Sequence, residues 1–466
     1  MNCLVLKKIK FYHVLIVEAV AFLLTFALSF LSKSLKIVPA FVLSIVLISC
    51  LVFSAKWFVD HFVKNEDKNL FAIISVVTAI IGLVIYTIIV FGRKYEYAMD
   101  YTVYYNQQLE MHTLFQKSSL KGCYAIISSF WFSDYSYFIN VLLEAPYCIF
   151  HASRDVYVII YYVIFIIPVI IANNVLLLNI YHKFSNQQNL LPFMILGNLA
   201  ILFAPIIHFA SWLGMPDIFG LYFVFGIMIL IINFDFERFS LINTIALAIL
   251  IICLTITRRW YVFWLVGFVP IVFVLYLVFT FIHNRESIKK LFIAEIKTAL
   301  LAGAIVGTFL APFLYHNAIA RNYTEEYAEW YYGGFPWEIN HQIFLLGWAF
   351  IALLFVGLVY GLINSKLRLI TITSVVGFLI SLFVFTRIQN MGYHHCLLLF
   401  SFYLILLYNN LVLIANCKKP FVRNIFISVF AIIIMINVVS IFGIIRFPEN
   451  SVFTGYRFEN YFQWVF

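Results

Sequence analysis

Charged residues are scarce in this sequence: Asp, Glu, Lys and Arg make up 11% of its 466 residues, whereas soluble proteins typically contain about 25%. Hydrophobic residues make up 64%, and the mean hydropathy is +1.00. These values exclude a soluble globular protein. Apolar runs of roughly 20 residues recur along the chain, which is the length that a helix needs to cross about 30 Å of hydrocarbon. We therefore expect an all-α fold, a polytopic bundle of transmembrane helices.

Cysteines in disulfide or metal-binding patterns are missing as well. No CxxC pair occurs, and most cysteines lie within apolar runs. An odd and dispersed set predicts neither a disulfide framework nor a zinc site. The seven cysteines are Cys3, Cys50, Cys123, Cys148, Cys253, Cys396 and Cys417.

Long basic runs are missing too, since no run exceeds three residues although the formal net charge is +9. A nucleic-acid partner is therefore not expected. Lys and Arg lie mostly in short loops, as the positive-inside rule predicts for cytoplasmic loops. With the basic N-terminus in the cytoplasm, the loops that contain Lys64, Lys183, Arg285 and Lys418 also face inward. Every unusual polar cluster then faces the other side.

Internal repeats and flexible linkers are also absent from the sequence, as are the repeated broken helices of many secondary transporters. We expect two N-terminal helices in 1–68, a core in 69–416, and a last helix with an extracytoplasmic tail in 417–466. Residues 1–30 have a basic start and no clear cleavage site, which predicts an uncleaved first helix. About thirteen spans are expected, at about 12–32, 37–58, 69–91, 156–181, 190–210, 217–234, 240–257, 260–283, 293–315, 341–363, 369–386, 395–416 and 423–445.

One long segment, residues 91–155, is too polar to lie comfortably inside a membrane. It is rich in Tyr, Phe, Asn and Gln. Pro146 and the polar pair Arg154-Asp155 indicate a helix that lies at the membrane interface and then turns into the next span. We expect a long extracytoplasmic first loop that carries interfacial helices and forms one wall of an active site.

Three acidic residues on this outer side are candidates for chemistry. Asp100 lies among aromatic residues at the expected membrane boundary, where a raised pKa would suit a general base. It could instead help to hold a divalent metal ion, or cap the following helix. Asp134 could orient an acceptor or cap a helix. Asp217 follows Pro216 at the start of a helix, where capping is ordinary chemistry.

Arginines also lie on the outer side, where the charge rule disfavours them. Arg258 and Arg259 precede Trp260 and Tyr261, and such a pair suits phosphate or pyrophosphate recognition through forked hydrogen bonds. The alternative is snorkelling to lipid headgroups, with Trp260 as an interfacial anchor. A second cluster suits an anionic headgroup or a sugar, and consists of Arg387, Gln389, His394 and His395. Aromatic residues of the loop 316–341 suit either carbohydrate binding or an interfacial belt.

The sequence resembles the GT-C superfamily of membrane glycosyltransferases, which use polyprenyl-phosphate-linked sugars. The resemblance covers roughly residues 70–400. It rests on the acid in the first long outer loop (Asp100), the segment Ser-Asp-Tyr-Ser-Tyr-Phe at 133–138, and the segment Ile-Phe-His-Ala-Ser-Arg that leads into the next span. The segments at 214–217, 258–261 and 387–395 also look like features of Gram-positive members. The sequence departs from the family pattern because it has no Asp-Glu pair and no His-Pro-Pro motif.

The resemblance implies an inverting glycosyltransferase in a bacterial plasma (inner) membrane, with a cytoplasmic N-terminus and an extracytoplasmic active site. A polyprenyl-phosphate sugar would be the donor, and a glycan, glycolipid or teichoic-acid-like polymer the acceptor. The acid would deprotonate the acceptor hydroxyl or position it with Mg²⁺ or Mn²⁺, while arginines neutralise the departing lipid phosphate. The implied residues are Asp100 and Asp134 as catalytic groups, Asp100 also as a metal ligand, and Asp217, Arg258, Arg259, Tyr261, Arg387, Gln389, His394 and His395 as substrate-binding groups.

Two other functions remain compatible with this sequence. An O-antigen-type or capsule-type polymerase would join lipid-diphosphate-linked oligosaccharides. A flippase or transporter of the same lipid-linked intermediates would need charged residues along a path through the membrane centre. The expected helix centres are nearly free of charge, which favours chemistry at one surface.

Overall fold

The computed structural model describes residues 11–30, 32, 35–92, 100–151, 153–186, 189–204, 207, 214–331, 333–392 and 394–446. These residues form helices and turns, and none of them forms a strand. The expected all-α class is therefore confirmed for the described part of the chain. The longer helices are α1 (Phe11–Leu28), α2 (Val38–Phe62), α3 (Lys68–Gly92), α4 (Asp100–Lys117), α5 (Ser119–Phe132), α6 (Phe138–Phe150), α7 (Arg154–Tyr161), α8 (Ile167–Phe184), α9 (Leu190–Phe203), α11 (Asp217–Ile232), α12 (Leu241–Thr257), α13 (Tyr261–His283), α14 (Ile288–Leu314), α16 (Gly334–Leu346), α17 (Trp348–Ile363), α18 (Arg368–Phe385), α19 (Leu397–Asn416) and α20 (Pro420–Arg446).

Membrane-spanning helices are numerous among the described residues. Seven helical segments are long and apolar enough to cross a membrane, or eight if the bent pair α16 and α17 forms one span. By length and composition, these segments agree with the expected class of helical membrane protein. Several other expected spans coincide with apolar helices that are too short for this criterion, such as α9, α11 and α12. The number thirteen stays a prediction.

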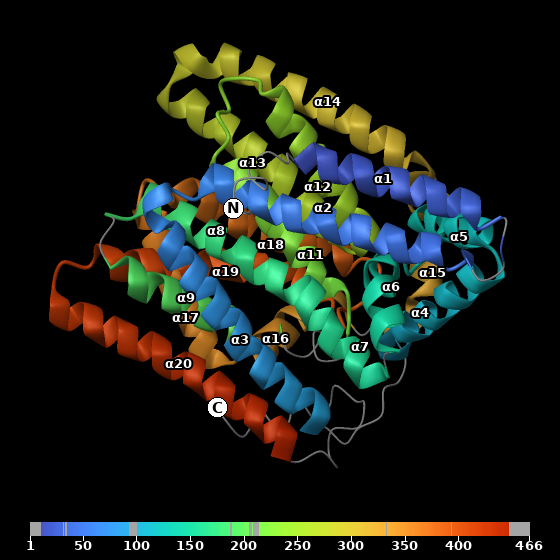
Figure 1. Cartoon of the computed structure of the whole chain (residues 1–466). Helices are drawn as coiled ribbons and strands as arrows, with labels where there is room; N and C mark the ends of the chain where they lie inside the picture. The colour runs from blue at the N-terminus through green and yellow to red at the C-terminus, as the bar shows by residue number, and fades with distance from the viewer. Residues whose placement is uncertain are drawn as a thin grey trace, which may run out of the picture.

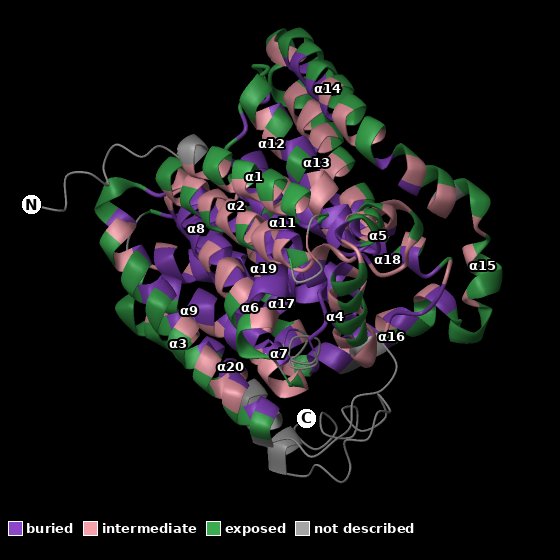
Figure 2. Cartoon of the chain, turned by 45° about the vertical axis from the view of Figure 1, so that its right-hand side comes forward, coloured by how far each residue is buried: buried purple, intermediate pink, exposed green. Residues whose placement is uncertain are grey.

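The centre of the bundle is formed by α8, α11 and α19 (Figure 2). All residues of α11 are buried, and 89% of the apolar window of α19 is buried, against 22% for α13 and for α14. A helix that is apolar on every side suits either a protein core or a lipid environment. The buried shares therefore place α19 in the core and leave much of α14 free to face lipid.

Small residues and amides join the core helices. A Cβ atom at Gly357 of α17 would lie 1.9 Å from the carbonyl oxygen of Leu406 in α19. The backbones of these two helices thus approach each other closely. Asn198 donates to Asn174 at 2.6 Å, and Asn174 donates to Ser75 at 2.9 Å. Small-residue contacts and interhelical hydrogen bonds of this kind hold helices together where no water competes.

Short helices gather at one end of the bundle. In Figure 1, α4, α5, α6 and α15 (Tyr323–Glu326) lie together at the right. We call this end, with α16, residues 386–392 and residues 394–396, the cap end. The expected polar segment 91–155 thus contains the three helices α4 to α6, and α7 continues through the π-helical turn η4 (Tyr162–Ile166) into α8.

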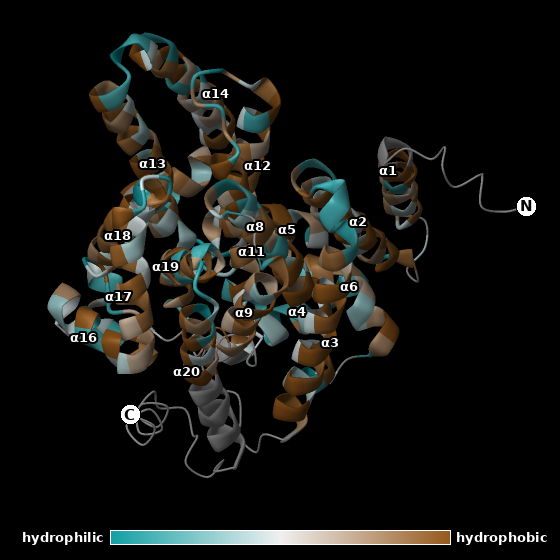
Figure 3. Ribbon diagram, turned by 90° about the vertical axis from the view of Figure 1, so that its left-hand side faces the viewer, coloured by the Kyte–Doolittle hydropathy of each residue, from teal (hydrophilic) through white to brown (hydrophobic). Residues whose placement is uncertain are grey.

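The hydropathy of the residues differs between the helices and the turns that connect them. Figure 3 shows hydrophobic residues along the helix sides and hydrophilic residues at many of the turns between them. The first helix, α1, packs against α2 at the edge of the bundle. In turn, α2 packs on α6, so the N-terminal helices adjoin the cap end.

Candidate functional site

Asp134, in the turn between α5 and α6, is the centre of an ion-pair cluster at the cap end. Its Oδ1 atom accepts hydrogen bonds from Nη1 of Arg259 and Nη1 of Arg321. The second carboxylate oxygen accepts from Nη2 of Arg321 at 3.3 Å. Three loops that are distant in the sequence, before α6, before α13 and before α15, therefore meet at one carboxylate.

The charge of Asp134 is fixed by its neighbours. Burial alone would raise the pKa of Asp134, but the hydrogen bonds and charges of Arg321 and Arg259 outweigh it and hold this pKa below its usual range. A carboxylate that is ionised and doubly paired is a weak proton acceptor near neutral pH. The geometry thus suits Asp134 for positioning the two arginines.

Arg259 is surrounded by aromatic side chains. Its guanidinium lies 4.7 Å from the ring centroid of Trp260, within range for a cation–π contact. It also donates to the hydroxyl of Tyr327, and to that of Tyr323 at 3.3 Å. Arg321 is bound further by Glu326, whose two carboxylate oxygens accept from Nε at 3.1 and 3.0 Å. Each arginine of this cluster already has a carboxylate partner.

Arg258 forms a separate, fully buried ion pair with Asp217. Its Nε atom donates to Oδ1 of Asp217 at 3.3 Å, and Nη1 donates to the hydroxyl of Tyr104 at 3.0 Å. Tyr261 donates to the backbone carbonyl of Asp217 at 2.5 Å. Oδ2 of Asp217 is buried without a hydrogen-bond partner among the described residues. Removing one member of such a pair would leave an uncompensated buried charge, which is costly.

The second predicted cluster packs against the first through His395. The imidazole lies 5.4 Å from the ring of Trp260 and 5.2 Å from that of Phe385. Its Nδ1 atom accepts from the backbone amide of Gly392 at 3.3 Å, so the neutral ring carries its proton on Nε2. Burial, then His394 and the arginines Arg258 and Arg259, lower the pKa of His395. The neutral ring can therefore donate one hydrogen bond.

Arg387 differs from the other predicted arginines because it is exposed. It forms no ion pair with any described residue. Gln389, close by in the chain, is buried, and its Nε2 atom has no hydrogen-bond partner in the described part of the chain. Among the described residues, this cluster thus offers a cation without a carboxylate partner and an unused amide donor.

The structure brings most of the predicted residues together at the cap end, in two groups. The first group contains Asp134 and Arg259, and it contacts His395 through Trp260. The other group is the buried pair Asp217 and Arg258 with Tyr261. The capping alternatives are not found: α6 and α11 both begin without a side-chain cap. Asp100 is the first residue of α4, but its side chain lies outside the described residues, so its predicted metal site does as well.

Several residues of the cluster were not predicted. Arg321, Tyr323 and Tyr327 belong to the loop 316–341, whose aromatic residues predicted carbohydrate binding or an interfacial belt but no contact with Asp134 or Arg259. Tyr104 follows Asp100 by one helical turn, and it belongs to no motif that would mark it as a site residue. Arg321 lies 187 residues from Asp134 in the chain. No local spacing rule could have joined them.

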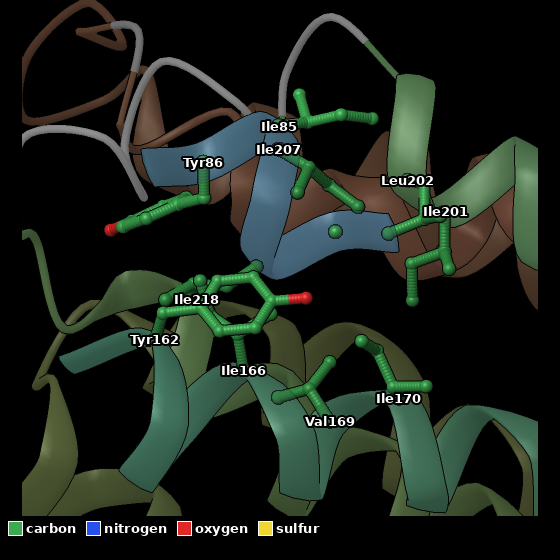
Figure 4. Close-up of a pocket in the computed structure, with 11 residues that line it drawn as sticks. Ile85, Tyr86, Tyr162, Ile166, Val169, Ile170, Ile201, Leu202, Ile207 and Ile218 are labelled. Atoms are coloured by element: carbon green, nitrogen blue, oxygen red, sulfur yellow. The ribbon is translucent and has the colours of Figure 1, made fainter. Parts of the chain in front are cut away.

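An apolar cavity lies among α3, η4, α8, α9 and the start of α11. Isoleucine, leucine and valine side chains of these helices face it (Figure 4). Ile218, one of its lining residues, directly follows Asp217 in the chain. Tyr86 and Tyr162 line the same cavity. The first two residues of α11 thus serve different environments: Asp217 forms the ion pair and Ile218 lines the apolar cavity.

Comparison with known proteins gave no match. No protein-family model, no curated protein and no solved structure matches this chain.

Proposed function

We propose that this protein is a membrane glycosyltransferase that moves a sugar from a polyprenyl-phosphate donor to a glycan or glycopolymer acceptor. The observation that carries this proposal is that the start of α11 contributes Ile218 to the apolar cavity and Asp217 to the ion pair with Arg258. The apolar tail of a lipid would suit the cavity, and its anionic head would need a cation that has no carboxylate partner. A lipid-phosphate sugar has such a tail and such a head.

Arg387 is the best-placed cation for the lipid phosphate in this proposal. Arg258 and Arg259 already bind Asp217 and Asp134. A phosphate would therefore have to displace a carboxylate from them, whereas Arg387 is exposed without a carboxylate partner among the described residues. The paired arginines would hold the loops in place, and Arg387 would neutralise charge on the leaving phosphate.

Asp100 is the proposed general base. It begins α4, and Tyr104, one helical turn further on, accepts the hydrogen bond from Arg258. Its place in the chain, in the first outer loop, favours a base that would deprotonate an acceptor hydroxyl or position it with a divalent metal ion.

The proposed topology follows from the charges. All thirteen expected spans would cross the membrane, with the cap end on the extracytoplasmic side and the basic turns in the cytoplasm. The shorter apolar helices α9, α11 and α12 would complete the bundle in contact with the longer ones. The polar helices α4 to α6 would then lie at the outer interface.

The transporter alternative is less well supported. The polar contacts in the middle of α8, α9 and α19 join neutral amides and hydroxyls, such as Asn174 with Asn198 and Asn173 with Tyr408. A translocation path for charged lipids would need charged groups there. The polar clusters lie at the cap end instead, which favours reaction at one surface.

The test is an assay with purified protein in proteoliposomes. A panel of polyprenyl-phosphate sugars would be supplied with acceptor, and the release of free polyprenyl phosphate measured. We expect release with one class of donor, and loss of release in Asp100→Asn at wild-type yield and melting temperature. Glu110→Gln, which changes an exposed acid of the same helix, is the matched control and should stay active. Full activity of Asp100→Asn would disprove the assignment of the base, and no release with any donor would disprove the function.

A further inference from the structure

A cluster of three potential metal ligands lies between α4 and α6, apart from the arginine clusters. Gln108, His112 and Gln116 follow one another at spacings of four residues on α4, and therefore share one face. Glu144 and Cys148 have the same spacing on α6. The two faces meet, so that an imidazole, a carboxylate and a thiol come together.

The three ligand atoms are close to one another. Nδ1 of His112 lies 2.7 Å from Oε1 of Glu144, and Sγ of Cys148 lies 3.3 Å from that oxygen and 3.8 Å from that nitrogen. Ligand atoms of a common tetrahedral zinc ion lie roughly 3.3–3.6 Å apart, given the usual bond lengths. Small side-chain rotations would therefore admit the ion.

Two glutamines already hold the ligands from outside. Gln108 is fully buried and donates to Oε2 of Glu144 at 2.5 Å, which leaves Oε1 facing the other two ligands. Gln116 contacts Nε2 of His112 at 2.9 Å. A metal on Nδ1 requires the proton on Nε2, which the oxygen of the Gln116 amide would accept after the amide turns over. Such outer partners orient the ligands of metal sites.

A catalytic cysteine is a poorer explanation of the cluster. In a nucleophilic triad the acid and the thiol use different nitrogens of the imidazole, whereas Glu144 and Cys148 both approach Nδ1 of His112. The arrangement is therefore not that of a nucleophilic triad.

A second set of similar residues, Glu338, His341 and Cys396, is better explained as structure. Oε2 of Glu338 accepts from the side chain of Asn390 at 3.2 Å and from the backbone amide of Met391 at 3.0 Å. Its other oxygen accepts from His341 at 2.8 Å and from Gln342 at 3.0 Å. The amide donors cannot act as metal ligands through nitrogen. The carboxylate is satisfied by fixed protein donors.

We propose that His112, Glu144 and Cys148 bind one Zn²⁺ ion, through Nδ1, Oε1 and Sγ. The combination of thiolate, imidazole and carboxylate suits zinc better than Mg²⁺ or Ca²⁺. Binding transfers the thiol proton to solvent, moves the imidazole proton from Nδ1 to Nε2, and forms three metal–ligand bonds. Three protein ligands leave the fourth position open to water or another ligand. This site is independent of the proposed sugar transfer.

Metal binding by the full-length protein in detergent tests the proposal directly. After treatment with a chelator, the protein would be titrated with Zn²⁺ and, as a spectroscopic probe, with Co²⁺. We expect about one equivalent of Zn²⁺ by elemental analysis, release of one proton, and a thiolate-to-cobalt absorption band in the near ultraviolet. Cys148→Ser should abolish the band, and His112→Gln should lower the affinity at least tenfold.

Cys123→Ser, in the neighbouring helix α5, is the matched control and should keep the band. If Cys148→Ser does not fold, alkylation of the wild-type protein replaces it: Zn²⁺ should protect Cys148, but not Cys123, from an iodoacetamide probe followed by peptide mass spectrometry. A band of equal strength in Cys148→Ser, no band in the wild type, or equal alkylation of Cys148 with and without Zn²⁺ would overturn the proposal.

Discussion

At the scale of single residues, the cap end consists of charges that neutralise one another. Arg259 and Arg321 share Asp134, and Arg258 binds Asp217. The first carboxylate joins loops that have no other ionic link among the described residues. A carboxylate that connects two arginines does more for the shape of a site than for proton transfer, because breaking it leaves two like charges facing each other.

Asp134→Asn should therefore destabilise the protein. We expect a loss of about 2 kcal/mol, between the values for exposed and buried ion pairs, because the side chain is 31% exposed. Thermal unfolding in detergent would measure it as a lower melting temperature. Glu326→Gln removes an exposed partner of Arg321 and leaves Asp134 in place, so its effect should be smaller. Equal effects of the two variants would contradict the central role of Asp134.

The lowered pKa of Asp134 predicts that its contribution to the stability of the folded protein depends on pH. A carboxyl whose pKa is lower in the folded than in the unfolded state contributes stability above its unfolded pKa, about 3.9, and loses it as the pH falls through the folded pKa. The difference in melting temperature between wild type and Asp134→Asn should be constant from pH 7 to 5 and shrink below about pH 4. A difference that grows on acidification would refute this.

Arg387 should affect substrate binding without affecting the fold. Arg387→Gln removes an exposed cation that has no ionic partner among the described residues, so the melting temperature should stay unchanged. The KM for the donor should rise about tenfold, which corresponds to the loss of one charge-assisted hydrogen bond. The control is Arg285→Gln, an exposed arginine of the turn between α13 and α14. Equal kinetics of both variants would exclude Arg387 from the site.

At the scale of elements, helix packing depends on a few close approaches. At Gly357 a side chain would collide with the backbone of α19, whereas at Gly303 of α14 no atom lies within 4 Å of the added Cβ. Gly357→Ala should destabilise the bundle by about 1–3 kcal/mol, the usual cost of overpacking, and Gly303→Ala should not. The melting temperatures of the two variants would be compared. Equal melting temperatures would contradict the prediction and would mean that α17 and α19 can move apart to accept the added methyl group.

The helices were predictable from the sequence, but their contacts were not. Apolar length alone placed a helix in each expected span, because backbone groups in lipid must bond within the helix. Asp134 and Asp217 had an equally simple local explanation as caps. Tertiary contacts with Arg259, Arg321 and Arg258 prevailed, and these partners lie 41 to 187 residues away. The contact between Cys148 and His112 was likewise not predictable, because these residues lie 36 positions apart and meet only when α6 packs on α4.

At the scale of the whole molecule, the proposed function depends on which way the bundle crosses the membrane. The basic turn between α13 and α14 contains Glu286, and the loop before α16 contains Glu329, and both residues are exposed. In a cysteine-free chain, Glu329→Cys should react with a membrane-impermeant maleimide on intact cells. Glu286→Cys should react only after the cells are opened, because the positive-inside rule places its loop in the cytoplasm. Mass-tag shifts on a gel measure both reactions. The opposite result would place the arginine clusters in the cytoplasm, where an outer-leaflet sugar donor could not reach them. Reaction of both residues from outside would mean that α14, the long helix between them, does not cross the membrane.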